Sequence, residues 1–287
     1  MIKFTNEDLY TKLTTLKNKF DILKANEIFE FQISNPDYKI LVDIAQINYC
    51  RFLTPKIIDE NTIIARYKKL NQNESFHKDT KSEEKYGINS TFATINKNEH
   101  TAFLYYYIQA LKNVNINKRI KILNLGVNSG DEFEVIKNYA SNFKNLELLG
   151  IDYSKSAINK AKETFTDKNI SFLCANINNL EELNLKEFDL IISIGTLQSS
   201  NINFNLLFQD IVQKYLKKDG AMILGFPNCR WIDGEMIYGA NAKNYPFPES
   251  SLLFKDVIFC KKYLQQKKYR VTITGKDYIF LTATSIR

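Results

Sequence analysis

The chain has 287 residues, a net charge of +7 and 44% hydrophobic residues, which suits one large globular domain or a domain with an appendage. No apolar run approaches the ~20 residues of a membrane-spanning helix, and the first residues lack the basic start and apolar core of a secretory signal. Four scattered cysteines and two histidines favour neither a disulfide framework nor a metal site. We therefore expect a metal-free protein without a membrane partner, in a reduced, cytoplasmic setting.

The first 115 residues favour helices. Apolar residues recur at helical spacing over 6–33, residues 38–52 also have a helical pattern, and 101–114 carry an apolar helical face. Between them, residues 71–100 are polar and suit a loop or lid. We therefore predict a helical N-terminal cap or lid over residues 1–115.

From residue 116 onward, apolar strands alternate with helical stretches, which is the pattern of a doubly wound, mostly parallel α/β sheet. The last two strands flank the short turn Gly275-Lys276-Asp277, so the final strand must run antiparallel. The expected strands are 120–125, 146–151, 170–174, 188–193, 221–226, 269–274 and 278–284, and the expected helical stretches are 131–142, 154–165, 179–184, 203–217 and 250–267. The prediction is a seven-stranded sheet within residues 116–287, with a long irregular segment at 227–249.

A strand, a glycine-bearing turn, a helix and a second strand that ends in an acid follow one another between residues 119 and 152. The turn carries Gly126 and Gly130, and the second strand ends in Asp152, whose carboxylate can accept hydrogen bonds from a ribose diol. A dinucleotide fingerprint would need glycines where Asn128 and Asp131 stand. This spacing counts against NAD and favours a nucleoside ligand without a phosphate at the turn.

These motifs resemble the class I S-adenosylmethionine-dependent methyltransferases over roughly the last 170 residues. The family's turn, acid-x-Gly-x-Gly-x-Gly, corresponds to Asn124-Leu-Gly126-Val-Asn128-Ser-Gly130, so asparagine replaces both the acid and the middle glycine. The segment Phe188-Asp189-Leu190-Ile191 is similar to the family's fourth strand. The resemblance implies a Rossmann-like fold with S-adenosyl-L-methionine as cofactor.

The resemblance also implies a role for each cofactor-binding residue. Gly126, Asn128 and Gly130 would flank the methionine part, and Asp152 would bind the ribose. Tyr153 would lie against the adenosine, Asn176 and Ile177 would contact the adenine, and Ser193 would stand at the end of the fourth strand. No strong base follows that strand, so the catalytic residue stays unassigned, with His100 and Gln198 as weak candidates. Methyl transfer would then depend mainly on proximity to the sulfonium.

The segment 227–249 is expected to contain the substrate site. Its aromatic residues Trp231, Tyr238 and Tyr245 suit a binding wall at the carboxyl edge of a sheet, although a small satellite core under the loop would have the same composition. Cys229 invites comparison with the nucleophile of RNA cytosine-5 methyltransferases, but the second cysteine motif of those enzymes is missing.

Three functional hypotheses follow. The first is methyl transfer by direct SN2 displacement to an O or N of a small molecule, because residues 1–100 are nearly balanced in charge, with 15 Lys/Arg and 14 Asp/Glu. The second is an RNA methyltransferase, because residues 251–287 carry eight Lys/Arg and two Asp/Glu. The third is a non-catalytic module that only binds S-adenosylmethionine. The oligomeric state is left open.

Overall fold

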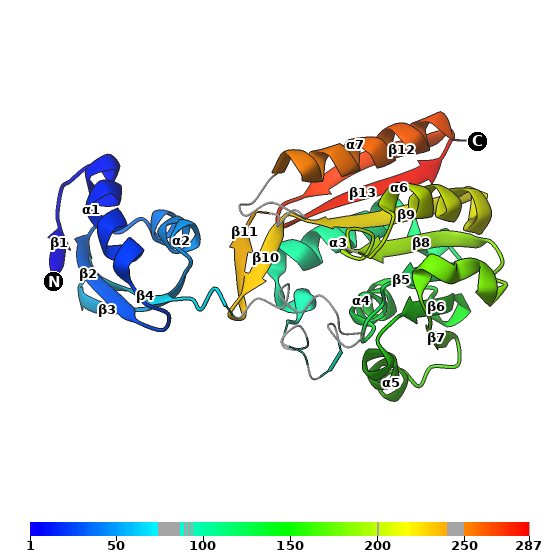
Figure 1. Cartoon of the computed structure of the whole chain (residues 1–287), viewed down its shortest axis with the longest axis horizontal. Helices are drawn as coiled ribbons and strands as arrows, with labels where there is room; N and C mark the ends of the chain where they lie inside the picture. The colour runs from blue at the N-terminus through cyan, green and yellow to red at the C-terminus, as the bar shows by residue number, and fades with distance from the viewer. Residues whose placement is uncertain are drawn as a thin grey trace. The chain divides into compact units, whose positions relative to one another are not determined.

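The computed structural model describes residues 1–73, 87–88, 90, 93, 95–199, 201–239 and 250–286. The chain divides into two compact units (Figure 1). The N-terminal unit comprises Met1–Lys78 with Trp231–Tyr238, and the second unit comprises Asp79–Arg230 with Gly239–Arg287. In the described part of the chain, no helix is both long and apolar enough to cross a membrane.

The N-terminal unit is built on a four-stranded sheet in the order β1-β2-β4-β3. Strand β1 runs parallel to β2, whereas β2 and β3 each pair antiparallel to β4. The strands are β1 (Ile2–Phe4), β2 (Ile28–Ser34), β3 (Cys50–Asp59) and β4 (Thr62–Lys69), and the helices are α1 (Leu9–Ile22) and α2 (Tyr38–Ile47). The predicted helical cap is therefore wrong for this region, which is α+β.

The misread segments have a physical explanation. The helical run that begins at α1 ends at Ile22, and Asn26 has the left-handed φ of 70° that turns the chain. Strand β2 then alternates buried residues, Phe31 and Ile33, with outward polar ones, which is the period of a strand. Phe31 stacks on Tyr67 of β4, with ring centroids 5.6 Å apart. Cross-strand burial of this kind outweighs helix propensity.

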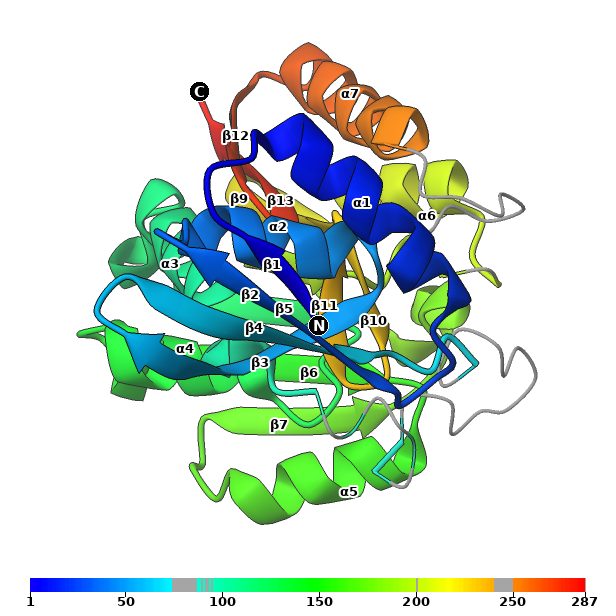
Figure 2. The ribbon, with the colours of Figure 1, turned by 90° about the vertical axis from the view of Figure 1, so that its left-hand side faces the viewer.

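Both helices of this unit pack on the same face of its sheet (Figure 2). Leu16 and Phe20 of α1 and Leu41 and Ile44 of α2 belong to one cluster with inward residues of the strands, including Phe31. The other face of the sheet is not covered by either helix. The unit therefore has a hydrophobic core of its own.

The second unit contains the predicted seven-stranded sheet, in the order β12-β13-β9-β8-β5-β6-β7. All neighbours run parallel except the pairs that β13 forms with β9 and β12. The strands are β5 (Lys121–Leu125), β6 (Glu147–Asp152), β7 (Ile170–Cys174), β8 (Phe188–Ile194), β9 (Leu216–Pro227), β12 (Tyr269–Gly275) and β13 (Tyr278–Ser285). The predicted fold class and the antiparallel last strand are confirmed.

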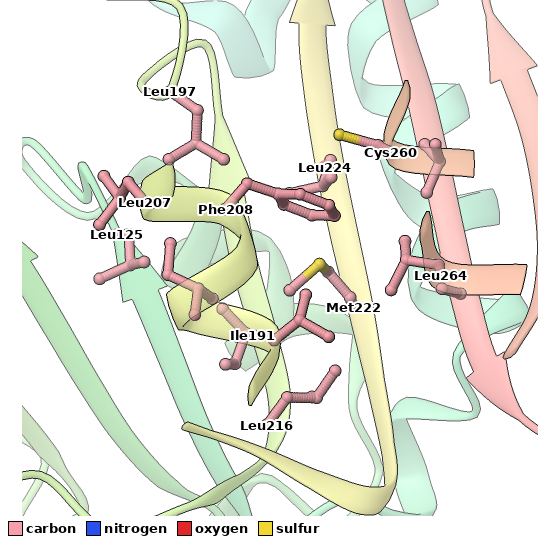
Figure 3. Packing of buried hydrophobic residues seen from close by; sticks show 14 of the residues in the cluster. Leu125, Ile191, Leu197, Leu207, Phe208, Leu216, Met222, Leu224, Cys260 and Leu264 are labelled. Carbon is pink, nitrogen blue, oxygen red and sulfur yellow. The ribbon is translucent and has the colours of Figure 1, made fainter. Parts of the chain in front are cut away.

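Helices cover both faces of this sheet. On one face lie α6 (Phe204–Asp210) and α7 (Ser250–Gln266), which bury Phe208, Cys260 and Leu264 against Met222 and Leu224 of β9 (Figure 3). The opposite face carries α3 (Thr101–Asn113), α4 (Asp131–Tyr139) and α5 (Lys155–Thr164). There, the rings of Phe103 and Tyr107 on α3 contact Phe280 of β13. Helices therefore cover both faces of the sheet, and the loops meet at the carboxyl ends of its central strands.

The predicted irregular segment 227–249 contains a hairpin, which corrects that part of the prediction. Its strands are β10 (Cys229–Ile232) and β11 (Glu235–Tyr238). They are joined by Asp233 and Gly234, both with left-handed φ, of 50° and 70°. Asp-Gly is a strong two-residue hairpin signal, and the sequence interpretation missed it. Residues 240–249 lie outside the described part of the chain.

Candidate functional site

The strand order of the second unit reverses between β5 and β8, because β6 and β7 continue to one side of β5 while β8 and β9 continue to the other. In open α/β sheets, ligands bind outside the carboxyl ends of the strands at such a switch point. The turn after β5, the end of β6 and the turn after β8 all belong to this edge. The predicted cofactor residues Gly126, Asp152 and Ser193 are thereby brought to one region.

The turn after β5 has three residues with left-handed φ: Gly126 at 78°, Asn128 at 47° and Gly130 at 98°. Asparagine is one of the few residues with a side chain that tolerates this conformation. Asn128 therefore replaces the middle glycine of the family's motif without changing the backbone that the motif requires.

Gly126 and Gly130 are also fixed by their neighbours. A Cβ atom built on Gly126 would lie 1.8 Å from Oγ1 of Thr196, and one on Gly130 would lie 2.4 Å from Cε2 of Phe165. Thr196 follows β8, so the turns after β5 and β8 pack directly against each other. A side chain at Gly126 would force these turns apart, and one at Gly130 would displace the Phe165 ring at the end of α5.

Asp152 is bound to the same turn. Its Oδ2 accepts a hydrogen bond from the backbone N–H of Asn128 at 2.9 Å, and its Oδ1 accepts one from the N–H of Ser154 at 2.9 Å. Burial raises the pKa of Asp152 above its ordinary value, although these N–H groups act in the opposite direction. The carboxylate is therefore partly desolvated, pre-oriented, and still able to accept further hydrogen bonds.

A buried charge pair that the sequence interpretation missed lies beside the turn. Lys97 Nζ and Glu132 Oε1 are 2.9 Å apart, with side chains only 9% and 2% exposed. Glu132 Oε2 accepts a hydrogen bond from Nδ2 of Asn124 at 3.3 Å. Lys97 lies in the short helix η3 (Lys97–Glu99) just before α3. The only sequence signal was an acidic first turn of a helix, which usually indicates a solvated cap.

The other predicted cofactor residues have more ordinary surroundings. Asn176 follows β7, where the Ala175 N–H donates to the Asp152 carbonyl at 2.9 Å, and its Oδ1 accepts a hydrogen bond from the Asn178 N–H at 2.9 Å. Ile177 is buried and Tyr153 is 45% exposed. Ser193 is buried, and its hydroxyl donates to the Leu125 carbonyl at 3.2 Å. That bond joins β8 to β5 and gives Ser193 a structural role.

The two weak catalytic candidates lie on either side of the turn in sequence. His100 is the N-cap residue of α3, and its side chain makes no capping hydrogen bond. Gln198 follows β8 and buries its Oε1 without a hydrogen-bond partner among the described residues. Cys229 is buried. Its pKa is raised mainly by this burial and, to a lesser extent, by the charge of Asp277. A buried thiol with a raised pKa makes a poor nucleophile.

Two of the predicted substrate residues, Trp231 and Tyr238, lie on the hairpin. Trp231 is only 6% exposed, whereas Tyr238 is 60% exposed. Leu70, Ile232 and Ile237 form a small separate core with Tyr49 packed against it, as in the satellite-core alternative. Tyr245 lies outside the described residues, as does most of the predicted lid at 71–100. Within the predicted segment, residues 229–238 therefore form a hairpin.

The sheet order, the left-handed turn after β5 and the acid that ends β6 together define a methyltransferase-type α/β domain. The family model described as "Methyltransferase domain" matches residues 116–273, more than half of the chain. The chain therefore belongs to this methyltransferase family and is an S-adenosylmethionine-dependent enzyme.

Solved structures with a similar fold include three methyltransferases. An S-adenosylmethionine-dependent methyltransferase from Aquifex aeolicus is 15% identical, covering 63% of this chain and 89% of its own, with a TM-score of 0.44. A precorrin-6y C5,15-methyltransferase from Geobacter metallireducens is 12% identical with the same coverage and a TM-score of 0.42. A ribosomal protein L11 methylase from Lactobacillus delbrueckii is 14% identical, covering 63% and 77%, with a TM-score of 0.40. A comparison with curated proteins finds no match.

Proposed function

We propose that the carboxyl ends of β5 and β6 hold the cofactor, with the ribose on Asp152 and the methionine part beside Gly126, Asn128 and Gly130. The acceptor capacity of the site supports this. The Asp152 carboxylate accepts backbone hydrogen bonds from Asn128 and Ser154, and the Tyr153 N–H also acts on it. A carboxylate has about four acceptor sites, so it can still accept a hydrogen bond from a ribose hydroxyl.

The reaction we propose is a direct displacement. When bound, S-adenosylmethionine would supply a methyl group for transfer to an O or N atom of the acceptor, with the C–S bond broken and the neutral thioether as leaving group. The residues of the chain orient this encounter and exclude water rather than carry out acid–base chemistry. Asn176 and Ile177 would fix the adenine, and His100 and Gln198 remain the candidates for contact with the acceptor.

A small molecule is our first candidate for the acceptor, and a surface cleft supports it. The cleft has a volume of about 640 Å³ and adjoins the residues that follow β8 and the first half of α7. Its lining combines side-chain amides, one basic and one acidic residue, and aromatic rings, which suit a polar molecule with a flat apolar part. The lining residues are Asn201, Ile202, Asn203, Phe204, Asn205, Lys255, Asp256 and Phe259.

RNA is the second candidate, because basic residues collect on the uncovered sheet face of the N-terminal unit. Strand positions that alternate with the core residues carry one acid and five basic residues: Glu30, Lys3, Arg51, Lys56, Arg66 and Lys68. Glu30 is shared by Arg66 and Lys56, at 2.8 and 3.1 Å. Lys3 and Lys68 have no acidic partner among the described residues. Such a net positive face suits phosphates.

The experiment that tests the function is transfer of a labelled methyl group from S-adenosylmethionine to a metabolite extract and, separately, to total RNA. Label in the extract alone, reduced by Asp256→Asn, would support the small-molecule acceptor. Label in RNA, reduced by Lys3→Glu with Lys68→Glu but not by the exposed control pair Lys17→Glu with Lys19→Glu, would support RNA. A protein that binds the cofactor but labels neither pool would favour the non-catalytic module.

A further inference from the structure

The Lys97–Glu132 pair is unusual because both charged groups are taken out of water. Burial alone would lower the pKa of Lys97, but Glu132, Tyr278 and Asp131 together outweigh burial and raise that pKa, so the lysine stays charged. Burying two charges costs several kcal/mol per ion before their attraction is counted. A buried ion pair is therefore weak evidence for stability. We look for the role of this pair in its location.

The pair and Asn124 connect the two ends of the turn Gly126–Gly130, called the cofactor turn below. Asn124, which donates to Glu132, lies two residues before Gly126, and Glu132 lies two residues after Gly130. The backbone carbonyl of Glu132 accepts a hydrogen bond from the Tyr107 hydroxyl at 3.3 Å. The network thus connects the end of β5, the start of α4 and helix α3.

Lys97 adds a fourth element to this network. Its neighbour Asn98 donates from Nδ2 to the Asp131 carbonyl at 2.9 Å and to Glu134 Oε2 at 3.2 Å. Helix η3 is therefore bound to the first turn of α4 through two adjacent side chains. Lys97 lies outside the matched residues 116–273, so a segment before the methyltransferase domain reaches its cofactor turn.

The neutral residue at position 124 follows from the same geometry. An acid there would bring a second carboxylate against Glu132, and Lys97 is the only cation whose ion pair with Glu132 is seen in the described chain. Two buried carboxylates that share one lysine would leave an unpaired charge, which is strongly unfavourable. Asn124 instead donates to Glu132, so the carboxylate comes from the helix and not from the strand.

We propose that Lys97 and Glu132 are positioning residues that hold Asn124 and the turn Gly126–Gly130 in the geometry that binds the methionine end of the cofactor. The proposal rests on the cofactor site proposed above. It distinguishes these two residues from a purely structural ion pair, since a structural pair could be replaced by packed apolar side chains without loss of affinity.

The test compares folding stability with cofactor affinity in the full chain. Lys97→Met leaves Glu132 buried and unpaired and should lower the unfolding temperature sharply. The double variant Lys97→Met with Glu132→Met replaces the pair with apolar groups of similar volume and should recover that temperature. We expect its dissociation constant for S-adenosylmethionine, measured by calorimetry, to stay raised by about tenfold or more, since small misplacements of a binding group are costly.

Matched variants make each outcome decisive. Asn124→Ala keeps the ion pair but removes its link to the turn, so affinity should fall with little change in unfolding temperature. The control is Lys137→Met. Lys137 also lies on α4, and the substitution breaks its half-exposed ion pair with Asp167. It should change neither the affinity nor the unfolding temperature. Wild-type affinity in the double variant, or in Asn124→Ala if the double variant does not fold, would overturn the proposal. A wild-type protein that does not bind the cofactor would overturn both this proposal and the proposed cofactor site.

Discussion

At the scale of single residues, the departures from the family's glycine motif have physical explanations. Asn128 adopts the left-handed φ of 47° that glycine would otherwise supply, and its backbone N–H binds Asp152. Asn124 is neutral because Glu132 brings the carboxylate from the following helix. The altered motif therefore keeps both the backbone shape and the buried acid of the turn.

Asp152→Ala should weaken cofactor binding by roughly tenfold to a hundredfold, because hydrogen bonds to a charged group are worth about 1.5–3 kcal/mol. Calorimetry with S-adenosylmethionine measures the change, and a melting curve checks that the variant is folded. Asp167→Ala, which removes the carboxylate of a partly exposed ion pair, is the control. An unchanged dissociation constant in folded Asp152→Ala would reduce Asp152 to a turn residue.

The same residue predicts a pH dependence. Burial raises the pKa of Asp152 above 3.8, so on acidification the ionised form, which we propose accepts the ribose hydrogen bonds, is lost at a higher pH than for an exposed aspartate. Wild-type affinity should therefore weaken as the pH falls toward this raised pKa, while Asp152→Asn should respond much less. Parallel pH profiles for the two proteins would contradict this assignment.

At the scale of elements, Asp189 ties three strands together at their amino ends. Its Oδ2 accepts hydrogen bonds from the backbone N–H groups of Lys121 and Ile120, at 2.7 and 3.2 Å, and its Oδ1 accepts one from Lys217 Nζ at 2.7 Å. The family-like segment Phe188–Ile191 is thus partly structural. Its acid lies at the sheet edge opposite the cofactor turn.

Asp189→Ala should lower the free energy of unfolding by about 1–3 kcal/mol and leave cofactor affinity unchanged in the folded protein. Burial alone would raise the pKa of Asp189, but Lys217 and the two N–H groups lower it below 3.8. The stabilisation is therefore present above the unfolded pKa and is lost as the pH falls through the folded one. Urea unfolding at neutral and acid pH checks this, and a stability difference that persists at low pH would contradict it.

The hairpin of β10 and β11 is held to α2 by one glutamine. Gln46 donates from Nε2 to the Met236 carbonyl at 3.1 Å and accepts at Oε1 from the Tyr238 N–H at 3.0 Å. Gln46→Ala should therefore speed hydrogen exchange at the Tyr238 amide, because that amide loses its hydrogen-bond acceptor and becomes exposed to water. Gln32→Ala on the uncovered face of β2 is the control, and equal exchange in both variants would mean that Gln46 does not hold the hairpin.

At the scale of the whole molecule, each of the two units carries exposed basic residues. Helix α7 buries Leu253, Val257, Cys260 and Leu264 toward the sheet, and Lys262, Lys267 and Lys268 at its end are exposed. The burial pattern of α7 therefore places Lys262 on a solvated face of the helix. The charged sheet face of the N-terminal unit carries further basic residues.

Reversal of Lys262, Lys267 and Lys268 to Glu should leave turnover nearly unchanged, because Lys262 is exposed on α7 and the other two are exposed just after it. Initial rates at low and high salt, with the acceptor identified by the labelling experiment, make the measurement. A large, salt-sensitive loss would instead indicate phosphate contacts at this helix. Since Lys267 lies over the ring of Tyr263 at 5.5 Å, Lys262→Glu alone is the control for lost packing.

The amino-acid sequence by itself determined the seven-stranded sheet of residues 116–287, its antiparallel last strand and the left-handed turn that ends in Gly130. These features follow from local signals: apolar runs of strand length, glycine where φ is positive, and an acid at a strand end. Strands as short as β7, Ile170–Cys174, are predictable because flanking turns bound them on both sides.

Only the tertiary structure decided the fold of the N-terminal unit and the network around the cofactor turn. Strands β2 and β4 form because Phe31 and Tyr67 are buried against each other across the sheet. The hairpin is held by residues far away in sequence, among them Gln46 and Arg51. Lys97 meets Glu132 across 35 residues, and nothing local to either residue signals a partner. Contacts between distant residues determine burial, and burial determines which charge is structural, which is solvated and which can serve the cofactor.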